Sequence, residues 1–528
     1  GQGSQGPGGQ GPQGPGSPPY QRQPPGHRGV KALIIALVLA VAVGGGAFAF
    51  YKTDPLSLFT GGPQAAEALP GEAVFYLGVD LDPSAEQKVK AVQFLNHFPA
   101  FRDNVDVKDA KSDVREAVFA KALESSACTG VTFANDVKPW LGNKFGLAGI
   151  KSQDGTAAPD FAFVMEVSSS GEAQDALDKL ASCGGSDSDY GIAFDGDYAL
   201  IAETQELADG FVADAEERSL ADSDEFSSDM DSLGDLGVAT MWVNIKSAAE
   251  LLAPSMVADD DLKLLSSSYE RAAATFRFDS DSVEVAASVF GDTEDIDHGD
   301  NKIVNLPEST VFAVSEAGGR QRIDETWDKV IDAARDGGVD VESQLAEFES
   351  QTGLNLPDDL ATVLGDNILF AVDQEGLTAE ALQSGDPSQV NAGVRFTSDP
   401  GDLNAIYAKV LALVQDETGQ EDIPVVKLET DDGIVLATND EYAESLSSDD
   451  GALGGTDEFQ SVTDDAQSKE FVLFFNFDAI EDQVVEAMQT EGDAQEVIDN
   501  ITPLQAFGTT TEVDGDYTVT TFRLSVND

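Results

Sequence analysis

The chain has 528 residues, of which 97 are Asp or Glu and 30 are Lys or Arg, so its formal net charge is −67. A hydrophobic fraction of 41% is enough to build sizeable cores, which excludes a wholly disordered chain. The acidic excess makes nucleic acids and anionic lipid surfaces unfavourable partners. Three His and two Cys leave little material for zinc or iron–sulfur sites, and we predict no metal or other cofactor.

The first 29 residues consist mainly of Gly, Pro, Gln and Ser. Because this stretch lacks the apolar side chains that offset the entropy of ordering, we predict a disordered tail over residues 1–29.

An uncharged apolar segment follows the tail. Ala32 to Tyr51 contains no charged residue, and a helix of this length spans roughly 30 Å, the thickness of the hydrocarbon layer of a membrane. We therefore predict one membrane anchor over residues 30–52, which places the chain in the plasma membrane. Arg and Lys precede the segment, so the positive-inside rule predicts a cytosolic tail and an extracytoplasmic remainder. The alternative is a signal peptide cleaved after Ala47-Phe48-Ala49.

Beyond a linker over residues 53–64, five sequence blocks occur twice in the same order. Such collinear matches indicate an internal duplication, and we predict one repeat over residues 65–300 and another over 301–528. The clearest pairs are Leu69-Pro70 with Leu306-Pro307, Thr129-Gly130 with Thr352-Gly353, Asp136-Val137 with Asp359-Leu360, Lys179 with Lys409, and Asp224-Glu225-Phe226 with Asp457-Glu458-Phe459.

Both repeats combine strand and hairpin patterns with helical ones. Asp195-Gly196 and Asp432-Gly433 each lie between β-rich runs and predict hairpins. The predicted fold class is therefore α+β, with two tandem related units that each contain antiparallel sheets and helices. Alternating strands are expected at Phe161 to Val167 and at Val283 to Val289. Helical spacing appears twice, in Ala85, Val89 and Val92, and in Trp327, Val330, Ile331 and Ala334.

The two cysteines, Cys128 and Cys183, both lie in the first repeat, and neither has a cysteine counterpart in the second. Joint absence is what a bonded pair would leave, so we predict a disulfide in an oxidising envelope. The alternative is two unrelated buried thiols.

Several of these segments together resemble a known family. The membrane segment, the Leu-Pro opening at Leu69, the run Val79-Asp80-Leu81-Asp82-Pro83-Ser84, and Trp140-Leu141-Gly142-Asn143 are similar to the actinobacterial single-pass membrane proteins grouped as domain of unknown function 3352. The resemblance implies a bacterial cell-surface protein over residues 65–528. It implies no established activity and no catalytic residues.

We find no catalytic or metal-binding motif. His97 fits a helix end and His298 an acidic linker, and neither stands in a hydrolase or metalloprotease pattern. The acidic run Asp292 to Asp297 fails the EF-hand spacing, because Ile296 occupies the fifth position. The sequence therefore nominates no catalytic, cofactor-binding or metal-ligating residue.

Two functions fit these observations. The first is a non-enzymatic envelope module that binds a protein, a wall polymer or an apolar ligand between its two repeats. The second is a hydrolase that acts on a wall glycan through Asp and Glu, with or without a cation. An apolar groove without converging carboxylates would favour binding, whereas two buried acids with raised pKa values would favour the hydrolase.

Overall fold

The computed structural model covers the repeats with several gaps. It describes residues 64–81, 85–99, 102, 115–116, 131–152, 159–183, 190–252, 269–291, 293, 296–336, 338–378, 381, 384, 386–419, 425–488 and 495–527.

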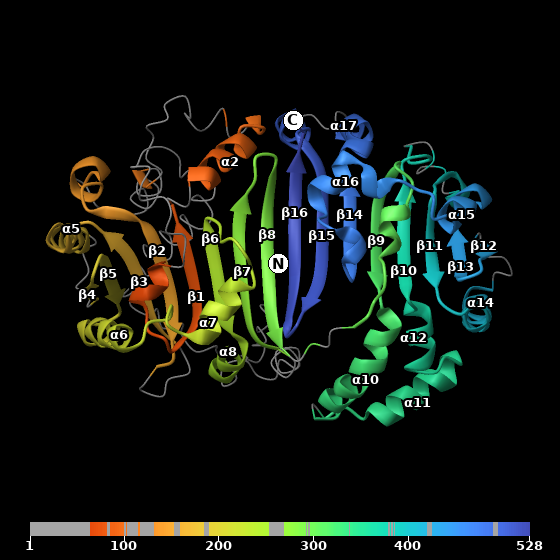
Figure 1. The fold of residues 1–528 in the computed structure, drawn as a ribbon, viewed down its shortest axis with the longest axis horizontal. Helices are drawn as coiled ribbons and strands as arrows, with labels where there is room; N and C mark the ends of the chain where they lie inside the picture. Colours follow the sequence, from red (N-terminus) through yellow and green to blue (C-terminus); the bar gives the residue numbers. More distant parts are fainter. Residues whose placement is uncertain are drawn as a thin grey trace, which may run out of the picture.

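The described strands form one sheet (Figure 1), in which every pairing between neighbouring strands is antiparallel. Its 16 strands run in the order β12-β13-β11-β10-β9-β14-β15-β16-β8-β7-β6-β1-β2-β3-β5-β4. The prediction of two tandem units with their own sheets is therefore wrong. The strands of both repeats hydrogen-bond into one continuous sheet, because the last strand of each repeat pairs with the last strand of the other.

The strand order is the same in each half when it is read outward from the centre. The first half contains β1 (Ala73–Asp80), β2 (Leu141–Ile150), β3 (Asp160–Val167), β4 (Gly191–Asp195), β5 (Tyr198–Ala202), β6 (Ala239–Asn244), β7 (Tyr269–Phe278) and β8 (Ser282–Gly291). The second half contains β9 (Thr310–Ala317), β10 (Asn367–Asp373), β11 (Ala392–Thr397), β12 (Val426–Glu429), β13 (Gly433–Ala437), β14 (Phe471–Asn476), β15 (Leu504–Asp514) and β16 (Tyr517–Val526). Each strand of the first half thus has a counterpart in the second, which relates the halves by an approximate two-fold axis at the centre.

The seam between the halves is the pair β8 and β16. Its register runs without a bulge from Ser282 opposite Ser525 to Phe290 opposite Tyr517. The two short strands β4 and β12 form the outer edges of the sheet.

One face of the sheet is covered by equivalent helices in both halves. These are α6 (Gln205–Glu217) and α7 (Asp224–Asp231) in the first half, and α15 (Asp440–Ser447) and α16 (Asp457–Val462) in the second. Ser223 caps α7 and Thr456 caps α16, each through its side-chain oxygen. Behind these caps, Phe226 packs edge-on against Trp242 and Phe459 packs against Phe474. We call this the covered face.

The opposite face carries helices near its two ends, and α2 (Ala85–Leu95) packs on the same face close to the centre of the sheet, against Phe278 of β7 and Val283 of β8. α5 (Ser170–Cys183) packs on the outer strands of the first half, and α14 (Pro400–Thr418) is its counterpart in the second. Each of these helices donates a lysine to an aspartate: Lys179 bonds Asp136 at 2.5 Å, and Lys409 bonds Asp359 at 2.8 Å. Both aspartates belong to a sequence block that occurs in each repeat, so the duplication preserved this pair.

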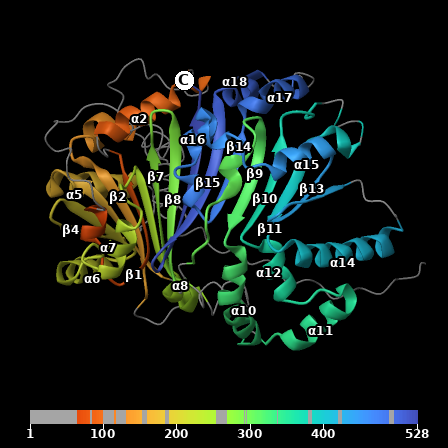
Figure 2. The same ribbon diagram turned by 45° about the vertical axis from the view of Figure 1, so that its right-hand side comes forward.

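Three further helices of the second half extend beyond the end of the strands (Figure 1). They are α10 (Gly319–Asp336), α11 (Val341–Thr352) and α12 (Asp358–Leu364). The view in Figure 2 shows α10 and α11 well away from the sheet. The remaining α-helices are α8 (Ile245–Leu252), α17 (Glu481–Met488) and α18 (Gln495–Ile501).

The hairpin predictions are confirmed, because Asp195-Gly196 joins β4 to β5 and Asp432-Gly433 joins β12 to β13 at equivalent places. The helix predicted after β1 also forms. Ala91 and Phe94 are buried in it, whereas Val89, one of the three residues that predicted the helix, is 53% exposed.

No helix in the described residues has the length and apolarity needed to cross a bilayer. The predicted tail (1–29), the predicted anchor (30–52) and the linker up to residue 63 lie outside the described residues.

Because the strands form a single sheet, we predict that the first repeat is not a stable monomer by itself. A chain of residues 64–300 would expose the whole ten-residue edge of β8, which is a template for pairing with other chains. We expect it to self-associate at concentrations where residues 64–528 stay dispersed, as measured by light scattering and analytical ultracentrifugation. A folded, monodisperse monomer of residues 64–300 would contradict this prediction.

Candidate functional site: the open face of the sheet

The face opposite α7 and α16 exposes apolar side chains in the middle of the sheet. Five large apolar side chains on described strands are substantially exposed: Phe161 (42%), Met241 (58%), Val285 (36%), Phe370 (37%) and Phe522 (40%). The strand registers place all five on the same side of the sheet. We call this side, between α5 and α14, the open face.

The apolar character of the open face continues across the seam from one repeat to the other. In an antiparallel sheet, directly opposite residues share a face, so the registers define rows of side chains that cross the strands. One row crosses the seam where Val285 lies opposite Phe522. From β7 to β10 this row consists of Phe276, Val285, Phe522, Thr509, Leu473, Val314 and Phe370.

Aromatic rings occupy the open face of the first half. Phe75 on β1 and Phe161 on β3 lie on either side of Gly149 on β2, and their ring centroids are 6.0 Å apart. A Cβ at Gly149 would lie only 2.1 Å from Cε1 of Phe75. Glycine is therefore needed here, because it lets the two rings meet over the middle strand.

The second half also carries a group of rings on this face, on the adjacent strands β9, β10 and β14. Phe312 occupies the position in the second repeat that Phe75 occupies in the first. Its ring centroid lies 6.0 Å from that of Phe370 and 6.4 Å from that of Phe475. Both contacts are edge-on, the geometry that aromatic pairs favour. The open face therefore carries a group of aromatic rings on each side of the seam.

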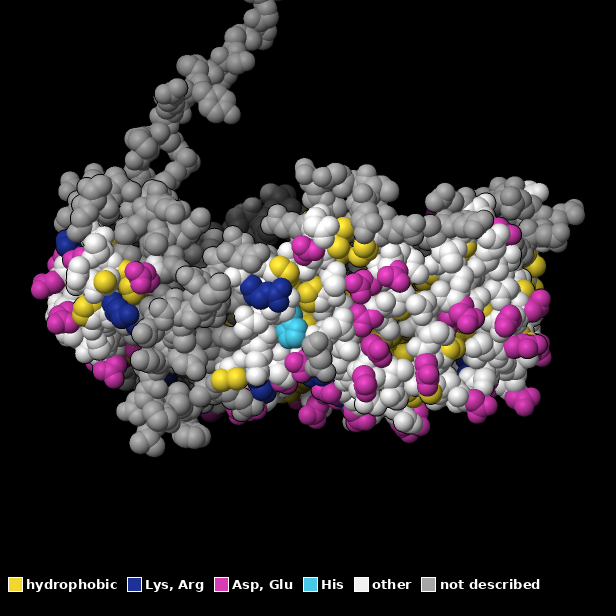
Figure 3. Space-filling view, turned by 90° about the horizontal axis from the view of Figure 1, so that it is seen from above, with side chains coloured by type: hydrophobic (Ala, Val, Ile, Leu, Met, Phe, Trp, Pro, Cys, Tyr) yellow, Lys and Arg dark blue, Asp and Glu magenta, His cyan; other side chains and the backbone are white. Residues whose placement is uncertain are grey.

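Charge is nearly absent from the middle of the open face. Rows of side chains on this face cross β7, β8, β16, β15, β14 and β9. Glu316 is the charged side chain among the described residues of these rows. Glu316 accepts a hydrogen bond from Arg322 at 3.3 Å. In contrast, acidic side chains are spread over much of the described surface on the second-half side in Figure 3.

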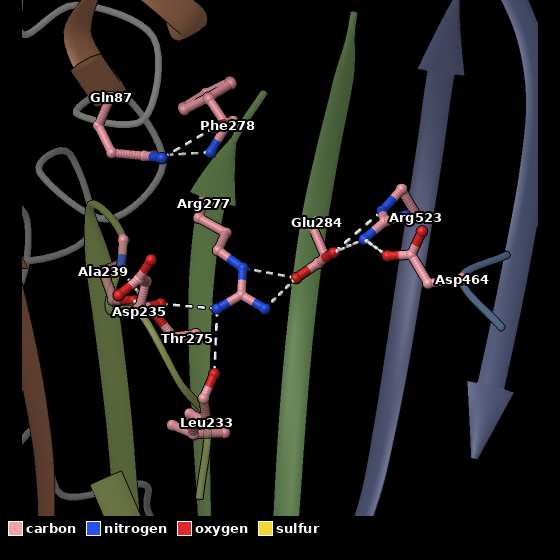
Figure 4. Close-up of polar contacts among 11 residues, drawn as sticks. Gln87, Leu233, Asp235, Ala239, Thr275, Arg277, Phe278, Glu284, Asp464 and Arg523 are labelled. Atoms are coloured by element: carbon pink, nitrogen blue, oxygen red, sulfur yellow. Dashed lines mark hydrogen bonds and ion pairs between the residues drawn. The ribbon is translucent and has the colours of Figure 1, made fainter. Parts of the chain in front are cut away.

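The charged groups of the seam lie on the covered face (Figure 4). Glu284 on β8 accepts hydrogen bonds from Arg277 Nε at 2.5 Å and from Arg523 Nε at 2.9 Å. Arg523 belongs to the second repeat and also bonds Asp464 at 2.6 Å, while Arg277 donates to the carbonyls of Leu233 and Asp235. This chain of ion pairs ties the two repeats together beneath the covering segments.

A second buried carboxylate lies nearby on the same face. Asp229 of α7 accepts from Trp242 Nε1 at 2.7 Å, from Arg271 Nε at 2.8 Å, and from the hydroxyl of Tyr517 at 3.0 Å. The Arg271 guanidinium also lies 3.9 Å from the ring centroid of Phe290. Burial, together with the adjacent Asp229 carboxylate, raises the pKa of Tyr517 to about 12, so its hydroxyl remains a donor.

These carboxylates are suited to structure rather than to proton transfer. Asp229 is held by Arg271, and Glu284 is held by Arg277 and Arg523, so both carboxylates are already engaged in ion pairs that join separate segments. Asp478 is the described carboxyl group whose pKa is clearly raised, because of burial, with Glu458 and Glu481 adding to the effect against a hydrogen bond from Asn527. Among the described residues, therefore, no two carboxyl groups with raised pKa values face each other from the two repeats.

The residues that the sequence nominated are only partly described. Cys128 lies outside the described residues, and Cys183 ends α5 without a described side chain, so their disulfide stays a prediction. His97 lies in the turn after α2, as predicted. His298 is half-buried beside Gly318, and its Nδ1 has no hydrogen-bond partner among the described residues. Within the described ranges, no group of three or more His, Cys, Asp or Glu residues could hold a metal ion.

The sequence contained a signal for the open face. Val283, Val285, Ala287 and Val289 occupy alternate positions along β8, with Glu284 and Ser288 among the residues between them, a pattern normally assigned to a strand with its apolar side inward. In the structure the polar side is inward: Glu284 is 7% exposed and Ser288 is 1% exposed, whereas Val285 is 36% exposed. Alternation separated the two faces correctly but did not say which one is covered.

The comparisons with known proteins agree in part with the resemblance seen in the sequence. The model of a protein family of unknown function, DUF3352, matches residues 32–189, which include β1, β2 and β3. Neither the curated proteins nor the solved structures contain a match to this chain.

The Asp229 cluster yields a stability prediction. Replacing Asp229 with Ala leaves Arg271 buried without its carboxylate, which we expect to lower the free energy of unfolding by about 3–5 kcal/mol. The matched control is Asp231→Ala, an exposed aspartate of the same helix, which should change it by less than about 0.5 kcal/mol. Urea unfolding followed by tryptophan fluorescence measures both, and equal effects would show that the cluster contributes nothing special.

Proposed function

We propose that this chain is a non-enzymatic binding module of the bacterial cell envelope, and that its open face binds an uncharged apolar ligand. The observation that carries the proposal is the gathering of the exposed apolar strand residues on one face that spans both repeats and has little charge in its middle. Burial of apolar surface stabilises a complex by about 25 cal/mol for each Å² removed from water. Met241 and Phe522 are thus the side chains expected to gain most from a bound ligand.

Charge favours an uncharged ligand over an anionic one. The chain carries a net charge of −67, so its field opposes the approach of an anion. The arginines that could neutralise such a ligand, Arg271, Arg277 and Arg523, are bonded to carboxylates on the covered face. The open face therefore offers apolar contact and threonine hydroxyls, but no free cation among the rows described above.

The proposed location rests on the sequence. The uncharged segment from Ala32 to Tyr51 supports attachment to the plasma membrane, with the repeats on its outer side. Apolar ligands of an envelope module in that place include membrane lipids and their precursors. A protease that is added to intact cells should then digest the repeats and spare the tail.

The open-face proposal predicts binding of a neutral apolar dye. Nile red should bind the folded chain, and Met241→Glu or Phe522→Glu should weaken binding roughly tenfold, because a carboxylate would have to be desolvated under the dye. The measurement is a fluorescence titration. Val410→Glu is the matched control, since Val410 is 41% exposed on α14 and its replacement should leave the affinity unchanged. Equal affinity of all variants would show that the dye binds elsewhere.

A competition experiment tests the charge argument separately. A long-chain alcohol should displace the dye at a lower concentration than the fatty acid of equal chain length at pH 8, where the acid is an anion. The difference should shrink in high salt, which screens the acidic field. Stronger displacement by the fatty acid would contradict selectivity for uncharged ligands.

A further inference from the structure

The second half carries an apolar surface that is separate from the open face. We call α10 and α11 the helical arm. Ile323, Trp327 and Ile331 follow one another at intervals of four residues along α10 and are only half-buried, while Val330 beside them is 51% exposed. On α11, Phe348 is 37% exposed. Of the arm's described apolar side chains, Val341 is the buried one.

The arm is firmly attached at its root. Arg322 in the first turn of α10 bonds Glu470 at 2.7 Å, and Glu470 is only 3% exposed. Arg320 bonds the hydroxyl of Ser398 at 2.7 Å. At the far end of the arm, Arg335 of α10 bonds Glu342 of α11 at 2.8 Å. These contacts position both helices relative to the sheet, so the apolar side chains are held in place while remaining partly exposed.

The first repeat shows how such a helix is normally accommodated. α2 follows the first strand of its repeat, as α10 follows the first strand of the second repeat. In α2, Ala91 and Phe94 are buried against Phe278 and neighbouring residues of the sheet. α10 instead extends past the end of the sheet (Figures 1 and 2), so its apolar residues lack the cover that those of α2 have.

The charges around these apolar residues indicate what kind of partner fits. From Gly319 to Thr352 the arm has nine acidic and four basic residues. Arg320 and Arg322 are engaged by Ser398 and Glu470 outside the arm, and Arg335 pairs with Asp332 and Glu342 within it, so the surface around the apolar residues, its rim, keeps an acidic excess. An apolar strip with an acidic rim complements a partner whose apolar residues are flanked by Lys and Arg.

From these observations we infer that the helical arm is a docking surface for a basic amphipathic segment of another protein. The apolar residues of that segment would pack on Trp327, Val330 and Phe348, and its cations would face the acidic rim. This surface is distinct from the open face, which lies on the sheet and carries little charge in its middle. An anionic membrane surface is disfavoured as the occupant by the same acidic rim.

Two synthetic helical peptides test the inference on the full chain. One has leucine on one side and lysine on the other, and its counterpart has glutamate in place of lysine. We expect the Leu/Lys peptide to bind, as measured by fluorescence anisotropy, and the Leu/Glu peptide not to bind. Val330→Asp combined with Phe348→Asp should weaken Leu/Lys binding at least about tenfold. Since these changes add negative charge, general attraction to lysine cannot explain such a loss.

The matched control is Val497→Asp on α18, where the valine is 50% exposed, and it should bind the Leu/Lys peptide like the unaltered chain. Met241→Glu on the open face should also leave this binding unchanged. A photo-crosslinking residue placed at position 330 should join the peptide, whereas the same residue at position 497 should not. Unchanged binding by the double variant, or equal crosslinking from both positions, would overturn the inference.

Discussion

The pairing of β8 with β16 is the constraint on which the rest of the architecture depends. It joins two repeats that are far apart in sequence by backbone hydrogen bonds, from Ser282 opposite Ser525 to Phe290 opposite Tyr517. Because successive side chains of a strand point to opposite faces, the same pairing brings Glu284 against Arg523 on one side and Val285 against Phe522 on the other. The ionic network of the covered face and the apolar continuity of the open face are thus consequences of one register.

The seam places its charges inward and its apolar residues outward, which reverses the usual arrangement. Buried ion pairs contribute little net stability unless every charged group also has its hydrogen-bond partners. The charged groups of the seam have such partners. Arg277, for example, bonds Glu284 and also the carbonyl oxygens of Leu233 and Asp235. Because Val285 and Phe522 stay exposed, folding does not gain the free energy of removing their apolar surface from water. A bound ligand that covers this face would gain that free energy instead.

The local features of the fold could be predicted from the sequence, but its global topology could not. Asp195-Gly196 and Asp432-Gly433 identified hairpins because their turn geometry is set by neighbouring residues. The duplication was visible because its blocks, such as Asp224-Glu225-Phe226 and Asp457-Glu458-Phe459, keep their order. Pairing of β8 with β16 joins distant segments, however, and no propensity or repeat specifies which strand edges meet. The prediction of two tandem units with their own sheets failed for this reason.

The candidate site was missed for a related reason. Alternation along β8 separates Val285 from Glu284, but the covered side is decided by α7 and the segments around it, which come from elsewhere in the chain. Likewise, the spacing of Trp327, Val330 and Ile331 indicates an amphipathic helix, but only the direction of α10 relative to the sheet shows that this stripe stays partly exposed.

The two halves share a framework but differ in the residues that fill it. α7 and α16 have equivalent caps and equivalent buried phenylalanines, yet the position of Asp229 in α7 is occupied by Val462 in α16. Val462 is 2% exposed and belongs to the apolar core of the second half, so the ionic cluster has no counterpart there. Asp229 in turn accepts a hydrogen bond from Tyr517 of the second half. Asp229 thus occurs in one repeat but takes a hydrogen-bond partner from the other. The side chains of the two repeats therefore differ, and each repeat can become specialised while the strand order of the sheet stays the same. The helical arm of the second half is a difference on a larger scale, because α10 projects past the end of the sheet whereas α2 packs on it, and the strand order is intact in both halves.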